Sequence, residues 1–140
     1  MGATERRGSD GAAAAGGRSG MCTVLVIDDE RMIQWSMEQT LGAAGHTVVT
    51  AGTVAEGLAR WRDSSPDEVF LDVRLPDSDG LGVLERLRAE NGQRPAVIVM
   101  TAFDEGGVAE RALRLGARAY MKKPFDFAEL QALVDRALQA

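Results

Sequence analysis

The sequence predicts a doubly wound α/β domain, a three-layer sandwich in which helices cover both faces of a five-stranded parallel sheet. Five short strand-like runs alternate along the chain with five longer segments of helical periodicity. The four prolines fall in the predicted connections or at a strand start, so none interrupts an element. Both observations give the same order of elements, and local signals that agree in this way favour a single fold.

The predicted strands are short runs of apolar and β-branched residues. Three of them consist almost wholly of such residues, which is typical of parallel strands that are covered on both faces. We expect the second strand to form an edge of the sheet. In chain order the strands are Thr23–Ile27, Thr47–Ala51, Glu68–Leu71, Ala96–Met100 and Arg118–Met121.

The predicted helices repeat apolar residues at three- and four-residue spacing, as Ile33, Met37 and Leu41 do in the first of them. In chain order the helices are Glu30–Ala44, Val54–Arg62, Leu81–Glu90, Glu105–Leu115 and Phe127–Leu138.

Helix ends carry recognisable residues. Thr53 and Asp126 are suitable N-caps for the second and fifth helices. Gly45, Gly92 and Gly116 follow the first, third and fourth helices, where a left-handed residue ends a helix at little cost. These signals place the helix boundaries to within a few residues.

The 140 residues are enough for one domain. Residues 1–20 are mostly Gly, Ala, Ser and Arg and include almost nothing large enough to bury. Such a segment cannot offset its own ordering entropy, so we expect a disordered tail. The folded domain is then residues 21–140.

The net charge of −5 and the absence of a basic stripe argue against direct nucleic-acid binding. No apolar run approaches the ~20 residues of a transmembrane helix, so we expect no membrane association. The single cysteine, Cys22, is typical of a thiol in a reducing compartment. We therefore expect a cytoplasmic protein.

Polar residues stand at the ends of four apolar runs: Asp28-Asp29-Glu30, Asp72, Thr101 and Lys123-Pro124. In a parallel sheet the carboxyl ends of the strands lie along one edge, so we expect these groups to meet. Clustered carboxylates destabilise one another unless a positive charge separates them, and Mg²⁺ prefers such hard oxygen ligands. A carboxylate can also form an acyl phosphate, whose transfer needs neutralised phosphoryl oxygens. The sequence therefore predicts a magnesium and phosphoryl site.

These motifs resemble the receiver domain of bacterial two-component response regulators over residues 21–140. The resemblance rests on Val24–Glu30, Phe70-Leu71-Asp72, Leu75–Gly80, Met100-Thr101-Ala102 and Tyr120–Phe125. Two segments, Glu30–Ser36 and Asp72–Asp77, look most like the N-terminal receivers of NtrC-type transcriptional activators. The resemblance implies a flavodoxin-like (βα)5 receiver fold.

The resemblance also implies an acceptor and a metal site. Asp72 would be phosphorylated, and Asp29 and Asp72 would bind Mg²⁺ directly together with the backbone carbonyl of Arg74. Asp28 would act through a metal-bound water. We assign Glu30 to the first helical turn, where an acid stabilises the helix dipole, in preference to a metal ligand.

A second group of residues would bind the phosphoryl group and respond to it. By resemblance, Thr101 and Lys123 would each contact a phosphoryl oxygen, and Tyr120 would be the aromatic switch residue, with plain edge packing as its alternative. We choose Lys123 over Lys122 because the lysine of the family immediately precedes the proline. The Lys123–Pro124 bond is a candidate cis peptide.

The implied partner is a sensor histidine kinase or a phosphotransfer protein. The implied output is a change in the face formed by the fourth helix, fifth strand and fifth helix, which would control homodimerisation or an output domain, as in transcriptional regulation. The protein would catalyse only its own phosphorylation and dephosphorylation, so we do not count it as an enzyme. The alternative is a stand-alone phosphorelay shuttle.

Two other classes of protein fit less well. A haloacid-dehalogenase-like phosphatase needs a second acid two residues after its nucleophile, where this chain has Arg74. A flavodoxin-like cofactor binder needs a Ser-, Thr- and Gly-rich phosphate loop after its first strand, where this chain has Asp28-Asp29-Glu30.

Overall fold

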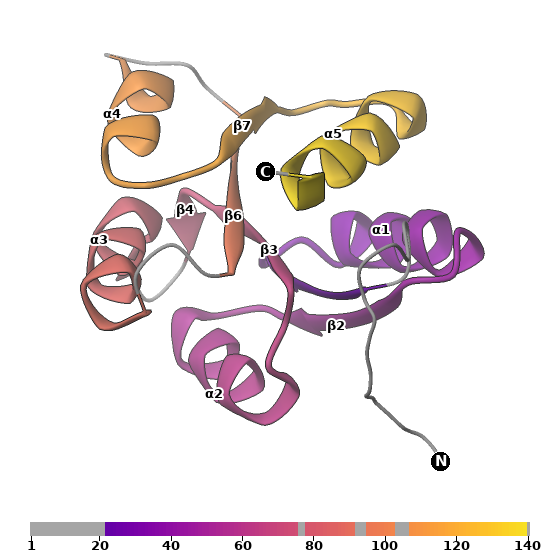
Figure 1. Cartoon of the computed structure of the whole chain (residues 1–140), viewed down its shortest axis with the longest axis horizontal. Helices are drawn as coiled ribbons and strands as arrows, with labels where there is room; N and C mark the ends of the chain where they lie inside the picture. Colours follow the sequence, from indigo (N-terminus) through magenta and orange to yellow (C-terminus); the bar gives the residue numbers. More distant parts are fainter. Residues whose placement is uncertain (1–21, 76–77, 92–94, 103–106, 140) are drawn as a thin grey trace.

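A computed structural model describes residues 22–75, 78–91, 95–102 and 107–139. Five parallel strands form the sheet in the order β2-β1-β3-β6-β7 (Figure 1). The predictions for residues 1–20, Asp77 and Gly92, and for the beginning of the fourth helix, lie outside the described residues. The predicted doubly wound architecture is confirmed.

The strands match their predicted positions closely. They are β1 (Thr23–Ile27), β2 (Thr47–Ala51), β3 (Glu68–Asp72), β6 (Ala96–Thr101) and β7 (Ala119–Lys122). The second strand is an edge of the sheet, as predicted. The third and fourth predicted strands are each one residue longer, because the hydrogen-bonded ladder continues through Asp72 and Thr101.

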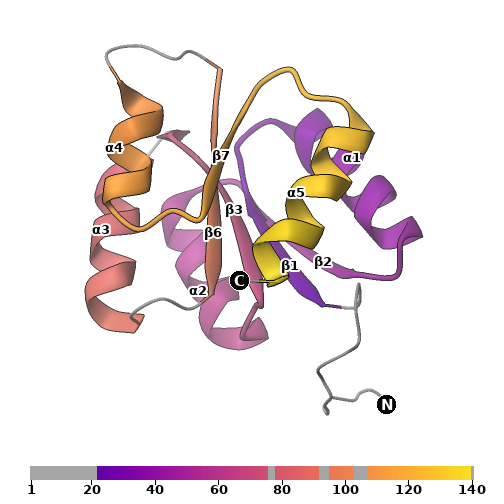
Figure 2. The same ribbon diagram turned by 45° about the horizontal axis from the view of Figure 1, so that its top comes forward.

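Helices cover both faces of the sheet. They are α1 (Arg31–Ala43), α2 (Val54–Ser64), α3 (Gly80–Asn91), α4 (Val108–Arg114) and α5 (Phe127–Gln139). Figures 1 and 2 show α1 and α5 on one side and α2, α3 and α4 on the other. None of the described helices is long and apolar enough to cross a membrane.

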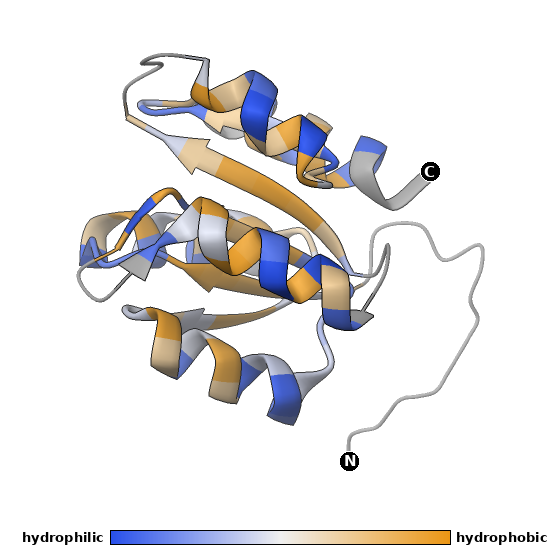
Figure 3. Cartoon of the chain, turned by 90° about the vertical axis from the view of Figure 1, so that its left-hand side faces the viewer, coloured by the Kyte–Doolittle hydropathy of each residue, from blue (hydrophilic) through white to orange (hydrophobic). Residues whose placement is uncertain are grey.

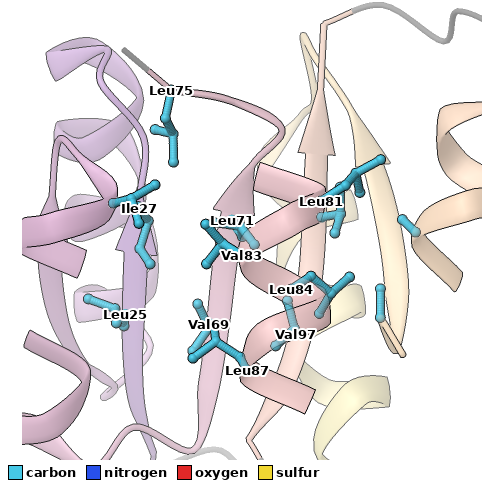
Figure 4. Packing of buried hydrophobic residues seen from close by; sticks show 14 of the residues in the cluster. Leu25, Ile27, Val69, Leu71, Leu75, Leu81, Val83, Leu84, Leu87 and Val97 are labelled. Atoms are coloured by element: carbon cyan, nitrogen blue, oxygen red, sulfur yellow. The ribbon is translucent and has the colours of Figure 1, made fainter. Parts of the chain in front are cut away.

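Two apolar layers result, one on each face of the sheet. Alternation along β1 and β3 sends Leu25, Ile27, Val69 and Leu71 into the layer beneath α2, α3 and α4. Figure 4 shows Val69 and Leu71 beside Val83 and Leu87 of α3. The intervening residues of the same strands pack under α1 and α5. The strands are accordingly mostly hydrophobic, whereas the helices alternate apolar and polar residues (Figure 3).

The predicted caps are present wherever the structure describes them. The Thr53 side chain accepts a hydrogen bond from the backbone N–H of Glu56 at 3.1 Å. Asp126 Oδ1 accepts one from the N–H of Glu129 at 2.7 Å. Gly45 and Gly116 have φ of 101° and 108°, in the left-handed region that favours glycine.

A short antiparallel hairpin between β3 and α3 was not predicted. It consists of β4 (Arg74–Leu75) and β5 (Ser78–Asp79), two residues each. Runs this short have no detectable periodicity, so sequence patterning cannot find them. The hairpin returns the chain to the sheet edge directly beside Asp72.

Candidate functional site

The carboxyl ends of four strands bring the predicted polar residues to one edge. Asp28 follows β1, Asp72 ends β3, Thr101 ends β6 and Lys123 follows β7. Backbone hydrogen bonds fix these ends against one another: the N–H of Val73 donates to Met100 O at 3.0 Å, and that of Lys123 to Thr101 O at 2.8 Å. The strand register therefore determines the position of the site.

Three carboxylates converge at this edge. Asp28, Asp29 and Asp72 each offer an oxygen, and these oxygens all lie within 4.8 Å of one another. Asp28 and Asp72 are buried, whereas Asp29 is exposed. Burial raises the pKa of Asp28 above its usual value, and the negative charge of Asp72 adds to this, while the hydrogen bond from Lys123 opposes it.

Lys123 provides the positive charge of the site. Its Nζ lies 2.6 Å from Asp28 Oδ2, 3.0 Å from Glu30 Oε1 and 3.1 Å from Asp72 Oδ2. Burial alone would lower the pKa of Lys123, but the hydrogen bond and charge of Asp28, with the charge of Asp72, raise it above its usual value. Lys122 is exposed, so Lys123 is the lysine that the fold places among the carboxylates. The Lys123–Pro124 peptide is cis, as the resemblance implied.

Backbone N–H groups orient two of the carboxylates. Glu30 N–H donates to Asp28 Oδ1 at 2.8 Å, and Arg74 N–H donates to Asp72 Oδ1 at 3.1 Å. Each carboxylate thus has one oxygen held by the backbone and the other turned to Lys123. Carboxylate oxygens retain further lone pairs, and three such groups within reach of one point suit a hard cation such as Mg²⁺.

The assignment of Glu30 to the first helical turn is wrong. Glu30 is the extended N-cap residue of α1, with φ −87° and ψ 117°, and its side chain makes no capping hydrogen bond. Its carboxylate binds Lys123 instead. A lysine that follows Glu30 by 93 residues in the chain leaves no local sequence signal, so this pair could not be predicted.

Two predicted residues lie beside the site without joining the carboxylate cluster. Thr101 is buried at the end of β6. Tyr120 is 41% exposed on β7 and lines an open groove between α4 and α5, with Leu113 and Leu133 among its neighbours. Asp79 shapes the loop before α3, because its Oδ1 accepts a hydrogen bond from the N–H of Leu81 at the start of that helix.

Two further residues build the site and were not assigned from the sequence. Gln34 Nε2 donates to the backbone carbonyl of Asp28 at 2.6 Å, which ties α1 to the end of β1. Gly80 lies against the chain after β3: a Cβ there would stand 2.4 Å from Asp72 O and 2.8 Å from Val73 Cα. This close approach of Gly80 to the backbone after β3 is visible only in three dimensions.

Comparison with known proteins agrees with this geometry. Residues 24–135 match the family described as the response regulator receiver domain. The DNA-binding transcriptional regulator NtrC of Escherichia coli K12 is 39% identical over 115 residues, which cover 82% of this chain and 24% of that protein. The probable transcriptional regulatory protein TcrX of Mycobacterium tuberculosis is 40% identical over 118 residues, covering 81% of this chain and 50% of TcrX. The chain thus spans about a quarter of the length of its NtrC relatives.

Solved structures share the fold. NtrX from Brucella abortus superimposes with a TM-score of 0.80 and 30% identity, covering 85% of this chain and 28% of that one. A CheY-like response regulator receiver domain protein from Methanospirillum hungatei gives a TM-score of 0.79 at 28% identity, covering 85% of this chain and 94% of that one.

Proposed function

This chain belongs to the response regulator receiver domain family of two-component systems, and on that basis we propose that it accepts a phosphoryl group on Asp72 in a Mg²⁺-dependent reaction. The donor is a sensor histidine kinase, a phosphotransfer protein or a small phosphodonor. One observation carries the proposal: three carboxylates and one lysine converge at the carboxyl edge of a parallel sheet. We place the receiver domain at residues 21–140.

The metal ligands in this proposal are Asp29, Asp72 and the backbone carbonyl of Arg74, with Asp28 acting through water. The orientation of Asp28 and Asp72 by backbone N–H groups supports these roles, because it presets the carboxylates before a cation binds. When bound, Mg²⁺ would neutralise the carboxylates and the phosphoryl oxygens that approach them.

The group transfer proceeds by attack of an Asp72 carboxylate oxygen on phosphorus. With a phosphohistidine donor the phosphorus–nitrogen bond breaks and its electron pair stays on the imidazole nitrogen. With acetyl phosphate the phosphorus–oxygen bond breaks and its electron pair leaves with acetate. In both cases an acyl phosphate forms on Asp72. Lys123 Nζ and the Thr101 hydroxyl bind phosphoryl oxygens and so place the group in line with the attacking oxygen. The protein thereby catalyses only its own phosphorylation and the hydrolysis of its own acyl phosphate.

The response to phosphorylation involves Thr101, Tyr120 and the face formed by α4, β7 and α5. A phosphoryl group adds about −1.5 to −2 charge and new acceptor oxygens, and these favour one of two arrangements that already exist. The exposed Tyr120 ring, beside the groove between α4 and α5, has room to change position. The changed face controls homodimerisation or an output domain in the cytoplasm, and gene regulation is the output that the names of the relatives favour.

Intact mass after incubation with acetyl phosphate and Mg²⁺ tests the proposal. We expect one phosphoryl adduct on the parent, none on Asp72→Ala, and none on the parent when EDTA removes Mg²⁺. Asp79→Asn is the matched control, because Asp79 lies in the same loop region and bonds to α3, and it should be modified like the parent. An adduct on Asp72→Ala would place the acceptor elsewhere, and a parent without adduct or Mg²⁺ binding would contradict the proposed function.

A further inference from the structure

The geometry points to Glu30 as a positioning residue. In the unphosphorylated protein its carboxylate accepts a hydrogen bond from Lys123 Nζ, and this bond breaks when the incoming phosphoryl oxygen binds the same N–H group. This inference rests on the proposed function, because it assigns a role in the same reaction. Glu30 would act through Lys123 and would not itself touch the phosphorus.

The donors of Lys123 are fully used. An ammonium group has three N–H donors, and Lys123 Nζ faces three carboxylate oxygens, from Asp28, Glu30 and Asp72, at 2.6 to 3.1 Å. A phosphoryl oxygen on Asp72 also needs a donor from this ammonium. One of the three existing contacts must therefore break when the phosphoryl group arrives.

Burial decides which contact breaks. The side chains of Asp28 and Asp72 are 0% and 9% exposed, so neither can move away from Lys123 into water. The Glu30 side chain is 59% exposed, and water can solvate its carboxylate as soon as it leaves Lys123. Glu30 is therefore the partner that is released.

The backbone of Glu30 is held by hydrogen bonds that do not involve its side chain. Its N–H donates to Asp28 Oδ1 and its carbonyl accepts from the N–H of Gln34 at 3.1 Å, whereas its side chain makes no capping bond to α1. A side-chain substitution at Glu30 therefore leaves the orientation of Asp28 unchanged. The same substitution removes a negative charge from the path of an anionic phosphodonor.

Glu30→Gln is the test variant. We expect acetyl phosphate with saturating Mg²⁺ to phosphorylate it about three- to fivefold faster than the parent, since an exposed ion pair is of modest strength. Beryllofluoride with Mg²⁺, a probe of the phosphoryl site, should bind it more tightly by a similar factor. Glu38→Gln, which removes one exposed acidic charge from the same helix, should match the parent in both assays.

Two readouts separate this role from others. The affinity for Mg²⁺ alone should be unchanged in Glu30→Gln, and a large loss would make Glu30 a metal ligand and overturn the inference. The carboxyl carbon signal of Glu30, followed by NMR, should move when beryllofluoride and Mg²⁺ saturate the parent, to the position it has in Lys123→Met. A stationary signal or equal phosphorylation rates would overturn the inference while leaving the proposed function intact. A parent that takes neither phosphoryl nor beryllofluoride would overturn both.

Discussion

Replacement of Glu68 by leucine is expected to raise the free energy of unfolding at pH 8 by about 4 kcal/mol. Glu68 is the first residue of β3, opposite Val24 of β1 and Ala96 of β6, and its side chain shares the α1 and α5 face with Phe70. It is 0% exposed, and among the residues that the structure describes neither of its side-chain oxygens has a hydrogen-bond partner. A buried carboxylate in this position destabilises the fold whenever it is ionised.

The effect depends on pH in a definite direction. Burial raises the pKa of Glu68 from 4.5 to about 8, the charges of Asp135 and Asp67 add to this, and Arg118 opposes it. Between these two pH values the folded protein holds a proton that the unfolded chain has lost, so this group makes stability fall as pH rises from 4.5 to 8. Below pH 4.5 Glu68 is protonated in both the folded and the unfolded state, and its contribution to the free energy of unfolding is fully present.

The nearby His46 acts in the opposite direction. Burial lowers the pKa of His46 from 6.5, with the charge of Asp135 opposing, so the folded state favours the neutral ring. Its contribution to stability therefore grows as pH rises toward and through 6.5. Because His46 is present in both proteins, the difference between parent and Glu68→Leu isolates the contribution of Glu68.

Urea unfolding at pH 5, 6, 7 and 8, followed by circular dichroism, measures this difference. The curves of the parent and Glu68→Leu should diverge steadily with rising pH. Glu85→Leu makes the same substitution at an exposed position on α3 and should track the parent at every pH. Parallel curves for the parent and Glu68→Leu would contradict the raised pKa of Glu68.

Gly80→Ala is expected to lose about 3 kcal/mol of stability and most of the phosphorylation rate. The added Cβ would lie 2.4 Å from Asp72 O, 2.8 Å from Val73 Cα and 3.0 Å from Val73 O. All three are backbone atoms, so no side-chain rotation can relieve the overlap. The chain between Asp72 and the hairpin must shift, and this is the segment that orients the Asp72 carboxylate through Arg74 N–H.

Gly82→Ala is the matched control for Gly80→Ala. It lies two residues further along α3, and a Cβ there meets nothing within 4 Å. Alanine favours a helix by about 0.5–1 kcal/mol over glycine, so this variant should be slightly more stable than the parent. Thermal unfolding measures the stability of both variants, and the rate of phosphorylation by acetyl phosphate measures their activity. Equal melting temperatures for the two variants would contradict the close packing at Gly80.

The order of elements and most of their bounds could be predicted from the sequence. Strands such as Thr23–Ile27 are buried on both faces and read as continuous apolar runs, and caps such as Thr53 act within four residues. Both signals are local. The β4–β5 hairpin could not be found, because two-residue strands are defined by their pairing and leave no pattern of their own.

The members of the site could be predicted because parallel strands bring their ends to one edge. Asp28, Asp72 and Lys123 meet at that edge in the structure, and their roles in the chemistry stay predictions. What each side chain contacts could not be predicted in the same way. Glu30 was assigned to a helix that begins one residue later, and Glu68 read as an ordinary strand residue although its side chain is buried without a partner.

The position of Lys123 late in the domain means that the acidic edge is synthesised before the lysine that neutralises it. The acidic residues that it contacts, and the strands β1 and β3 that hold them, leave the ribosome well before β7 does. Before Lys123 is synthesised, only dissolved cations can neutralise these carboxylates, and their mutual repulsion opposes pairing of the strand ends. Addition of β7 beside β6 completes the sheet and delivers the lysine in one step. Of the strands in this sheet, β7 is translated last, and it brings the positive charge to the acidic edge.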